Sequence, residues 1–172
     1  MESNTLIIDK NNIIKLISKD NKEFSITKKS AELSGLIKNL KEDLTVDDAI
    51  PLTEVDNKTL ERVVTYLSKF NGQPPPEIEK PLKSSILKEV TDEWSADFIE
   101  ELDLEALTNL IVTANFMDIP SLLELSIAKL ASMCKDKSEE EIFKSFGISN
   151  VYSEEERNKL KEENKWIEDN LN

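Results

Sequence analysis

Side chains that commonly carry out catalysis are scarce in this chain. It contains no histidine and a single cysteine, Cys134. Histidine is the commonest general base and a frequent metal ligand, and a cysteine nucleophile relies on such a base. One cysteine also excludes an intramolecular disulfide and a thiolate metal cluster, and the three glycines of the chain provide no phosphate-binding loop. The sequence therefore predicts a protein that is not an enzyme and holds no cofactor, with Cys134 as a small buried hydrophobe.

Two runs of glutamate are the remaining candidates for a metal site. Residues 139–141 and 154–156 are each Glu-Glu-Glu, and each run follows a serine, Ser138 or Ser153. Consecutive residues on a helix point in different directions, so three adjacent carboxylates do not converge on one ion. The serine and the third glutamate of each run instead match the capping box, in which the two side chains satisfy backbone N–H groups reciprocally. We therefore predict two helix starts and no metal.

The two helices that follow these starts carry too few apolar side chains to close a core of their own. Those side chains are Ile142, Phe143, Phe146, Leu160, Trp166, Ile167 and Leu171. A helix with so thin a stripe usually buries it against another protein, so residues 135–172 are predicted to form a docking extension. Tryptophan is enriched among binding hot spots, which favours a partner contact for Trp166. The sequence leaves open the alternative that Trp166 packs on its own domain.

Charge and length narrow the class of protein further. The 172 residues include 22 basic and 35 acidic side chains, for a net charge of −13. A nucleic-acid binder needs a basic surface that displaces counterions, so we expect neither nucleic-acid binding nor attachment to an anionic membrane. Residues 1–5 lack the basic start and apolar run of a signal peptide, and no stretch reaches the apolar length of a membrane span. We expect a cytoplasmic and nuclear protein.

Residues 1–134 carry the patterns of a packed domain that is strand-rich early and helical later. The expected elements are a β-hairpin over 13–26, a helix with apolar positions from 33 to 44, an edge strand at 50–52, a helix from 56 or 57 to 70, a mobile loop or linker over 77–91, ordered structure from Trp94, a helix from 103 and a central buried helix over 121–134. Asn71-Gly72 and the prolines at 74–76 end the helix before the loop. Strands that cluster before helices indicate an α+β fold.

Several markers in this order resemble a known family. They are the prolines at 74–76 before a charged loop, Trp94, the Ala-Asn-Phe-Met-Asp-Ile run at 114–119, and Glu-Asn-Lys-Trp at 163–166. Together they are similar to the S-phase kinase-associated adaptor family, the F-box-binding subunits of SCF ubiquitin ligases, over nearly the whole chain. The resemblance implies a BTB/POZ domain, here residues 1–134, with two additional C-terminal helices, here residues 135–172.

The resemblance also implies a function. Members of the family are non-catalytic adaptors, whose BTB part binds the N-terminal region of a cullin and whose C-terminal helices clasp the F-box of a substrate receptor. The adaptor thereby connects interchangeable receptors to a core that carries the RING subunit and recruits a ubiquitin-conjugating enzyme. We expect F-box proteins and a cullin as direct partners, and the other two as indirect ones.

Family positions are carried over to this chain residue by residue. Asn115 and Phe116 fall where the family has an Asn-aromatic pair that faces the cullin, and Phe116 lacks the hydroxyl of the more usual tyrosine. The residues that the resemblance assigns to the F-box surface are Leu122, Leu125, Ala131, Ile142, Phe146, Ile148, Trp166 and Ile167. Without the resemblance, Asn115 would be interpreted as a helix C-cap and Phe116 as a core residue.

Two related modules remain as alternatives. An elongin C-like chain would end near Cys134, whereas this one continues through two capped helices. A homodimerising POZ scaffold without F-box binding would form a stable dimer. Weak self-association of the free chain is compatible with the adaptor hypothesis, because exposed apolar docking surfaces pair with one another.

Overall fold

The computed structural model describes residues 12–40, 49–148 and 153–170, except for the side chains of Arg157, Lys161 and residues 165–170. The chain forms two compact units, 1–135 and 136–172, and the predicted domain boundary lies one residue away from this division. In the described part, no helix is long and apolar enough to cross a bilayer.

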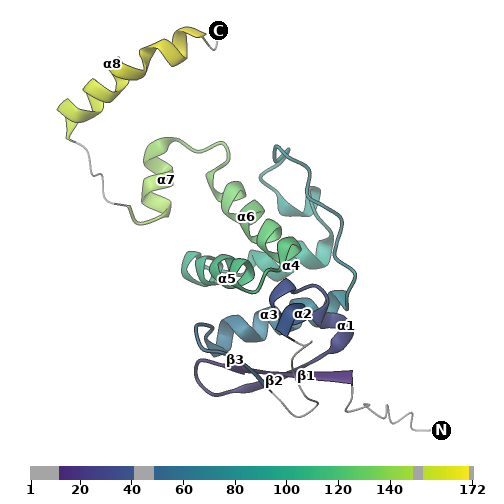
Figure 1. Ribbon diagram of the computed structural model, residues 1–172. Coiled ribbons are helices and arrows are strands. Elements are labelled where there is room, and N and C mark those ends of the chain that lie inside the picture. The colour runs from purple at the N-terminus through teal and green to yellow at the C-terminus, as the bar shows by residue number, and fades with distance from the viewer. Residues whose placement is uncertain (1–11, 41–48, 149–152, 171–172) are drawn as a thin grey trace. The chain divides into compact units, whose positions relative to one another are not determined.

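A three-stranded sheet forms the N-terminal end of the first unit (Figure 1). The central strand β1 (Ile13–Ser18) pairs antiparallel with β2 (Glu23–Thr27) and parallel with β3 (Ala49–Leu52). Alternate residues of β1 are buried, as the period of two requires. The predicted hairpin is therefore confirmed. So is the edge strand, since β3 stands at one end of the strand order β2-β1-β3 among the described residues and an edge tolerates the missing N–H of Pro51.

Two short helices lie in the chain between β2 and β3. They are α1 (Lys28–Ala31) and α2 (Gly35–Leu40). The sequence predicted one helix with apolar positions from 33 to 44. The structure instead has a break before Gly35, and the part of this prediction at 41–48 lies outside the described residues.

Four longer helices complete the first unit, and each begins where the sequence places a start signal. They are α3 (Asn57–Phe70), α4 (Glu93–Glu100), α5 (Leu104–Phe116) and α6 (Pro120–Cys134). Asp56, Asp92 and Asp103 cap the first three by accepting backbone hydrogen bonds. Pro120 opens α6, where its missing N–H costs no helical hydrogen bond. Asn71 ends α3 in the left-handed conformation, with φ of 44°.

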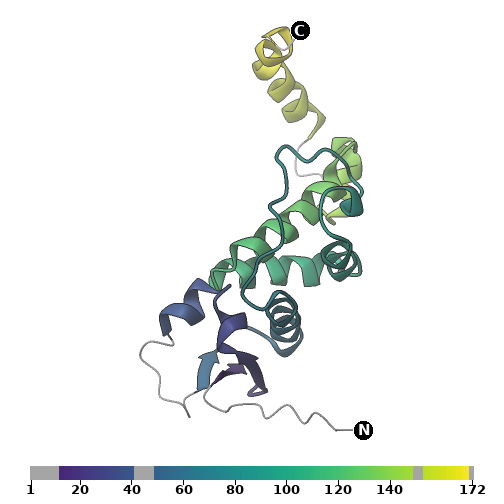
Figure 2. The same cartoon turned by 90° about the vertical axis from the view of Figure 1, so that its right-hand side faces the viewer.

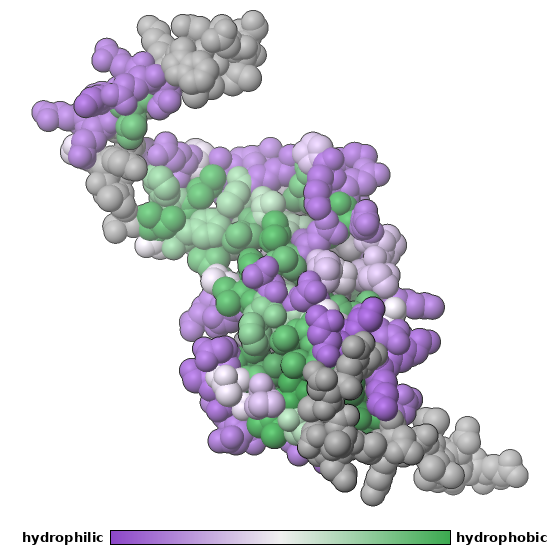
Figure 3. All heavy atoms as spheres, viewed as in Figure 1, coloured by the Kyte–Doolittle hydropathy of each residue, from purple (hydrophilic) through white to green (hydrophobic). Residues whose placement is uncertain are grey.

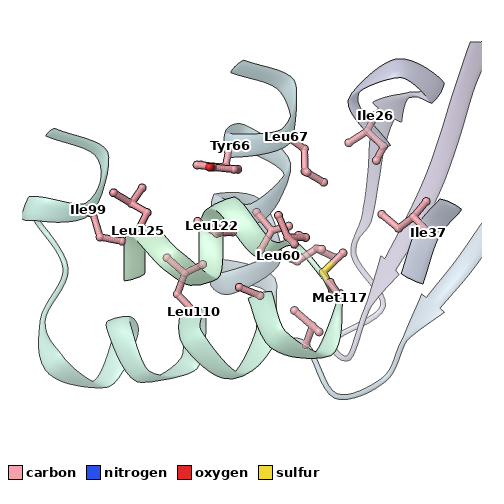
Figure 4. Close-up of a cluster of buried hydrophobic side chains, with 14 of the residues drawn as sticks. Ile26, Ile37, Leu60, Tyr66, Leu67, Ile99, Leu110, Met117, Leu122 and Leu125 are labelled. Carbon is pink, nitrogen blue, oxygen red and sulfur yellow. The ribbon is translucent and has the colours of Figure 1, made fainter. Parts of the chain in front are cut away.

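The core of the unit lies between α3, α4, α5 and α6 and continues to the inner face of the sheet. Figure 4 shows Ile99, Leu110, Leu122 and Leu125 directed into one interior from three helices. The prediction that α6 is buried nearly all round is wrong in part. Its buried residues are Leu122, Leu125, Ser126, Ala128 and Lys129, whereas Ile127 on another side is 48% exposed. Apolar composition identified the helix as a core helix but did not show which of its sides is covered.

An aromatic cluster joins α3 to α4. Trp94 stacks on Phe98 at 5.0 Å between ring centroids and meets Phe70 edge to face at 5.5 Å. Tyr66 lies within 6.3 Å of all three rings, and burial raises its pKa to about 12, so its hydroxyl remains protonated. Lys69 lies over the face of Trp94 at 5.3 Å. Trp94 is thus part of the domain's internal packing.

Residues 77–91 are irregular, as expected, apart from the 3-10 helix η2 (Leu87–Glu89). They are not a free linker, however, because Ile78 and Leu87 are buried in the core cluster and Leu82 packs against it. These apolar side chains stand singly among charged residues, so no periodic pattern indicated that they would be buried.

The second unit contains α7 (Glu139–Ser145) and α8 (Glu154–Asn170). Ser138 and Glu141 form the predicted capping box, in which each side chain accepts a hydrogen bond from the other's backbone N–H. Ser153 and Glu156 make the same reciprocal pair. Both predicted helix starts are confirmed. Unlike the helices of the first unit, α7 has no buried residue.

Candidate functional site

One exposed apolar surface lies at the C-terminal end of α5. Asn115 and Phe116, the last two residues of this helix, are exposed, Phe116 by 45%. Val112 is 63% exposed, and it stands one turn before Phe116, so the two share a face. The interpretation of Asn115 as a cap and Phe116 as a core residue is wrong, because Met117 is the cap and is fully buried instead. Val112 was missed by the sequence reasoning, although its spacing of four residues from Phe116 could have indicated it.

The turn after α5 fixes this surface to the N-terminal half of the unit. The hydroxyl of Ser34 donates a hydrogen bond of 2.6 Å to the carbonyl of Met117, and the N–H of Gly35 donates to the carbonyl of Asp118 at 2.8 Å. A Cβ at position 35 would lie 1.8 Å from the Asp118 carboxylate, so a side chain there would have to displace that group. These contacts hold the end of α5 in place.

A second apolar surface lies on α6 and borders a groove of about 830 Å³. Leu123, Ile127 and Ala131 follow one another at four-residue intervals and all line the groove. Figure 3 shows apolar side chains gathered over α5 and α6 on one face of the first unit. Sequence reasoning did not assign Leu123 and Ile127 to a site, although the composition of α6 showed more apolar positions than one buried face requires.

The predicted F-box residues of α6 differ in exposure. Ala131 is exposed, whereas Leu122 and Leu125 are fully buried in the domain's own core. Leu125 nevertheless borders the groove. Leu122 is therefore a core residue away from the groove lining, and the outer positions Leu123 and Ile127 present the accessible surface.

The third apolar surface is α7 with the turn that ends it. Ile142, Phe143 and Phe146 are only half-buried, and Ile148 is 47% exposed. After the cap Phe146, Gly147 adopts φ of 64°. The N–H of Ile148 then bonds the carbonyl of Phe143, and that of Gly147 bonds Lys144. This is a Schellman ending, which directs the residue after the glycine back toward the helix.

Trp166 and Ile167 lie within α8, but their side chains are outside the described residues. For these two residues the structure provides the helix and no contact. Their assignment to an F-box surface, like that of Ile142, Phe146 and Ile148, stays a prediction.

The third glutamate of each run forms part of a helix cap. A backbone hydrogen bond from Ser138 lowers the pKa of Glu141, and one from Ser153 lowers that of Glu156. Each carboxylate is thus held ionised at the start of its helix, where the helix dipole also favours negative charge. Among the described residues no group of His, Cys, Asp or Glu side chains could hold a metal ion. Cys134 is partly rather than fully buried.

Comparisons with known proteins agree with this arrangement of a POZ-type unit and a helical extension. Residues 12–72 match the model of the Skp1 family tetramerisation domain, a POZ domain, and residues 120–167 match that of the Skp1 family dimerisation domain. The α+β fold with a POZ-type domain and C-terminal helices is therefore confirmed.

Similar proteins cover nearly the whole chain. The S-phase kinase-associated protein 1 homolog of Tetrahymena thermophila is 42% identical over 91% of this chain and 94% of its own length. The E3 ubiquitin ligase complex SCF subunit sconC of Arthroderma otae is 38% identical over 91% and 94%. The SCF ubiquitin ligase complex protein SKP1b of Dictyostelium discoideum is 36% identical over 91% and 96%. With two family domains in the expected order and relatives similar over nearly their full length, this chain belongs to the Skp1 family.

Proposed function

We propose that this protein is a non-catalytic adaptor of an SCF ubiquitin ligase, which joins a cullin to F-box substrate receptors. The names of its relatives support this role, since several are subunits of SCF complexes. The observation that carries it here is that apolar side chains stay exposed on separate elements, at the end of α5 and in the turn after α7, while those of α7 itself are only half-buried. An adaptor needs such surfaces, because it must hold two partners at once.

The end of α5 is assigned to the cullin. Its Phe116 ring and Val112 form a small apolar patch beside the amide of Asn115, and a patch of this kind suits the desolvated centre of a protein interface. The hydrogen bonds from Ser34 and Gly35 hold the patch in a fixed position. A rigid patch loses little conformational entropy on binding, which favours affinity.

The F-box is assigned to α6 and the C-terminal helices. The exposed face of α6 and the half-buried side chains of α7 offer apolar area that the chain itself leaves partly open. Because α7 and α8 are specified by their own caps, they present this area as helices, a recognised mode of docking. The match of residues 120–167 to the family disfavours an elongin C-like module, which would lack these helices. We expect the adaptor to act in cytoplasm and nucleus.

The test is a pair of variants, one for each surface. Asn115→Lys with Phe116→Lys should abolish binding to a cullin N-terminal fragment and leave F-box binding unchanged. Trp166→Ala should do the reverse and weaken F-box binding by about 2–4 kcal/mol, the range of hot-spot truncations. Both affinities are measured by calorimetry on the same preparations.

A matched control adds the same charge elsewhere. Thr65→Lys with Ser68→Lys places two lysines on exposed positions of α3 and should preserve both interactions. Loss of both interactions in either test variant, with an unchanged unfolding temperature, would show that the chain does not have two independent docking surfaces. Absence of F-box and cullin binding by the unaltered chain would overturn the adaptor role itself.

A further inference from the structure

Residues 73–86, the strap, connect α3 to η2 and cross α6 on its way (Figure 2). The groove beside α6 has the strap as its opposite wall, through Pro74, Pro76, Ile78 and Leu82 among others. The outer side of α6 therefore faces a segment of the same chain, and the groove between them is open.

Three side chains tie the strap down. Ile78 is 8% exposed and belongs to the core cluster, and Leu82 packs against that cluster. Lys80, between them, forms an ion pair with Glu124 of α6. The strap thus has two apolar anchors and one charged contact with the helix that it crosses.

Both ends of the strap are fixed. Before it, Gly72 adopts φ of 84° and lies so close to α1 that a Cβ would be 2.8 Å from the carbonyl oxygen of Lys29. After it, Leu87 of η2 is buried. Release of the anchors would therefore move the middle of the strap while its ends stay in place.

The middle of the strap is held by side chains rather than by its backbone. In the part of the chain that the structure describes, no backbone–backbone hydrogen bond involves residues 74–85. Four of these residues are proline, which has no N–H to donate. Segments with few buried contacts and no backbone ladder open locally at a free energy far below that of global unfolding.

The groove that the strap borders includes residues assigned to the receptor. Leu125 and Ala131, which the resemblance places at the F-box surface, line it together with Leu123 and Ile127. We propose that the strap is a built-in cover of α6, which an F-box receptor must displace to reach the full apolar face of that helix. This inference rests on the proposed adaptor function.

A cover of this kind changes the apparent dissociation constant of any receptor that binds this face of α6. When only a fraction of molecules is competent to bind, the apparent dissociation constant is the intrinsic one divided by that fraction. Anchoring the strap lowers the fraction and loosening it raises the fraction. The strap therefore tunes receptor binding through its contacts with α6.

The experiment loosens the strap and measures binding of an F-box fragment to the full chain. Ile78→Ser with Lys80→Gln removes one anchor and the ion pair, and it should tighten binding on the order of tenfold through faster association. Lys83→Gln is the matched control, because Lys83 pairs with Glu79 inside the strap and not with α6. It should leave affinity and association rate unchanged.

Hydrogen exchange of the same proteins gives a second measure. In the free chain, amides of residues 77–86 should exchange faster in the double variant than in the unaltered chain. On receptor binding, exchange in the strap should rise while that in α6 falls. Three outcomes would each contradict the proposal that the strap covers α6. They are equal exchange in both free chains, weaker binding by the double variant, and protection of the strap in the complex.

The two proposals fail in different ways. If the unaltered chain binds the F-box fragment and the double variant binds it no better, the cover is wrong and the adaptor role stands. If neither protein binds the fragment, the adaptor role is wrong, and the proposed displacement of the strap by a receptor is wrong as well.

Discussion

In the first unit, α3, α5 and α6 each bury one face, and the end of α5 is fixed to another part of the unit by hydrogen bonds from Ser34 and Gly35. In the second unit, α7 is equally well specified by its capping box but buries no side chain. Both units contain helices, but α7, unlike the described helices of the first unit, gains no buried side chain from tertiary packing. Local signals are therefore sufficient to define where a helix lies, whereas burial determines how much the helix contributes to the stability of the fold.

A matched pair of isoleucine substitutions, one in each unit, should give the greatest difference in the free energy of unfolding. Ile99→Ala should lower the free energy of unfolding by about 3 kcal/mol, because Ile99 is fully buried and its removal leaves a cavity. Ile148→Ala should change it by less than about 0.5 kcal/mol, since Ile148 is already exposed to solvent. Urea denaturation of both variants measures the difference. Similar losses would mean that the second unit contributes to the core and that the contrast is false.

A smaller effect is expected at the helix caps. Asp56→Ala removes the cap of α3 and its hydrogen bonds to Lys58 and Thr59, which should cost about 1 kcal/mol of global stability. Ser138→Ala removes the equivalent cap of α7 and should reduce the helicity of residues 139–145 while leaving global unfolding unchanged. Backbone chemical shifts by NMR, together with urea denaturation, distinguish the outcomes. A global loss in the Ser138 variant would contradict the independence of α7.

The smallest effect is expected on the pH dependence of the free energy of unfolding, through the carboxylate of Asp56. Burial alone would raise the pKa of Asp56, but the hydrogen bonds from Thr59 and Lys58 outweigh it and leave the pKa below its ordinary value of 3.8. Its stabilising contribution is therefore complete above the unfolded pKa and is lost as the pH falls through the lower folded pKa. Asp56→Asn should flatten this part of the stability profile.

Glu141 and Glu156 also have lowered pKa values, and by the same sign their contribution to the folded caps is complete above the unfolded pKa and is lost as the pH falls through the lower folded pKa. Acidification below their ordinary value of 4.5 should therefore loosen the starts of α7 and α8 without a step in global stability. NMR titration of the two carboxyl groups measures this. A coincident global transition would show that these caps belong to the cooperative core.

Most of the fold could be predicted from the sequence because its signals are local. Ser138 and Glu141 specify a helix start within four residues, Asp103 does so for α5, and the alternation of β1 reports its buried face. The helix predicted from 33 begins only at Gly35, whose N–H bonds the carbonyl of Asp118, far along the chain. No local pattern contains such a contact.

The candidate site was less predictable for the same reason. Phe116 and Val112 are as apolar as their buried neighbours, so composition could not distinguish exposed from covered positions on α5. The resemblance to the family indicated Phe116 but not Val112. The packing of Ile78 and Leu82 was missed because single apolar residues among charges have no period.

The aromatic cluster also has an optical consequence. Trp94 is held in one asymmetric orientation by its stack on Phe98 and the edge contact with Phe70. A tryptophan fixed in this way produces a near-ultraviolet circular dichroism signal, which disappears when tertiary packing is lost even if helices persist. The first unit therefore carries an intrinsic chromophore that reports the integrity of its core in any variant, with no added label.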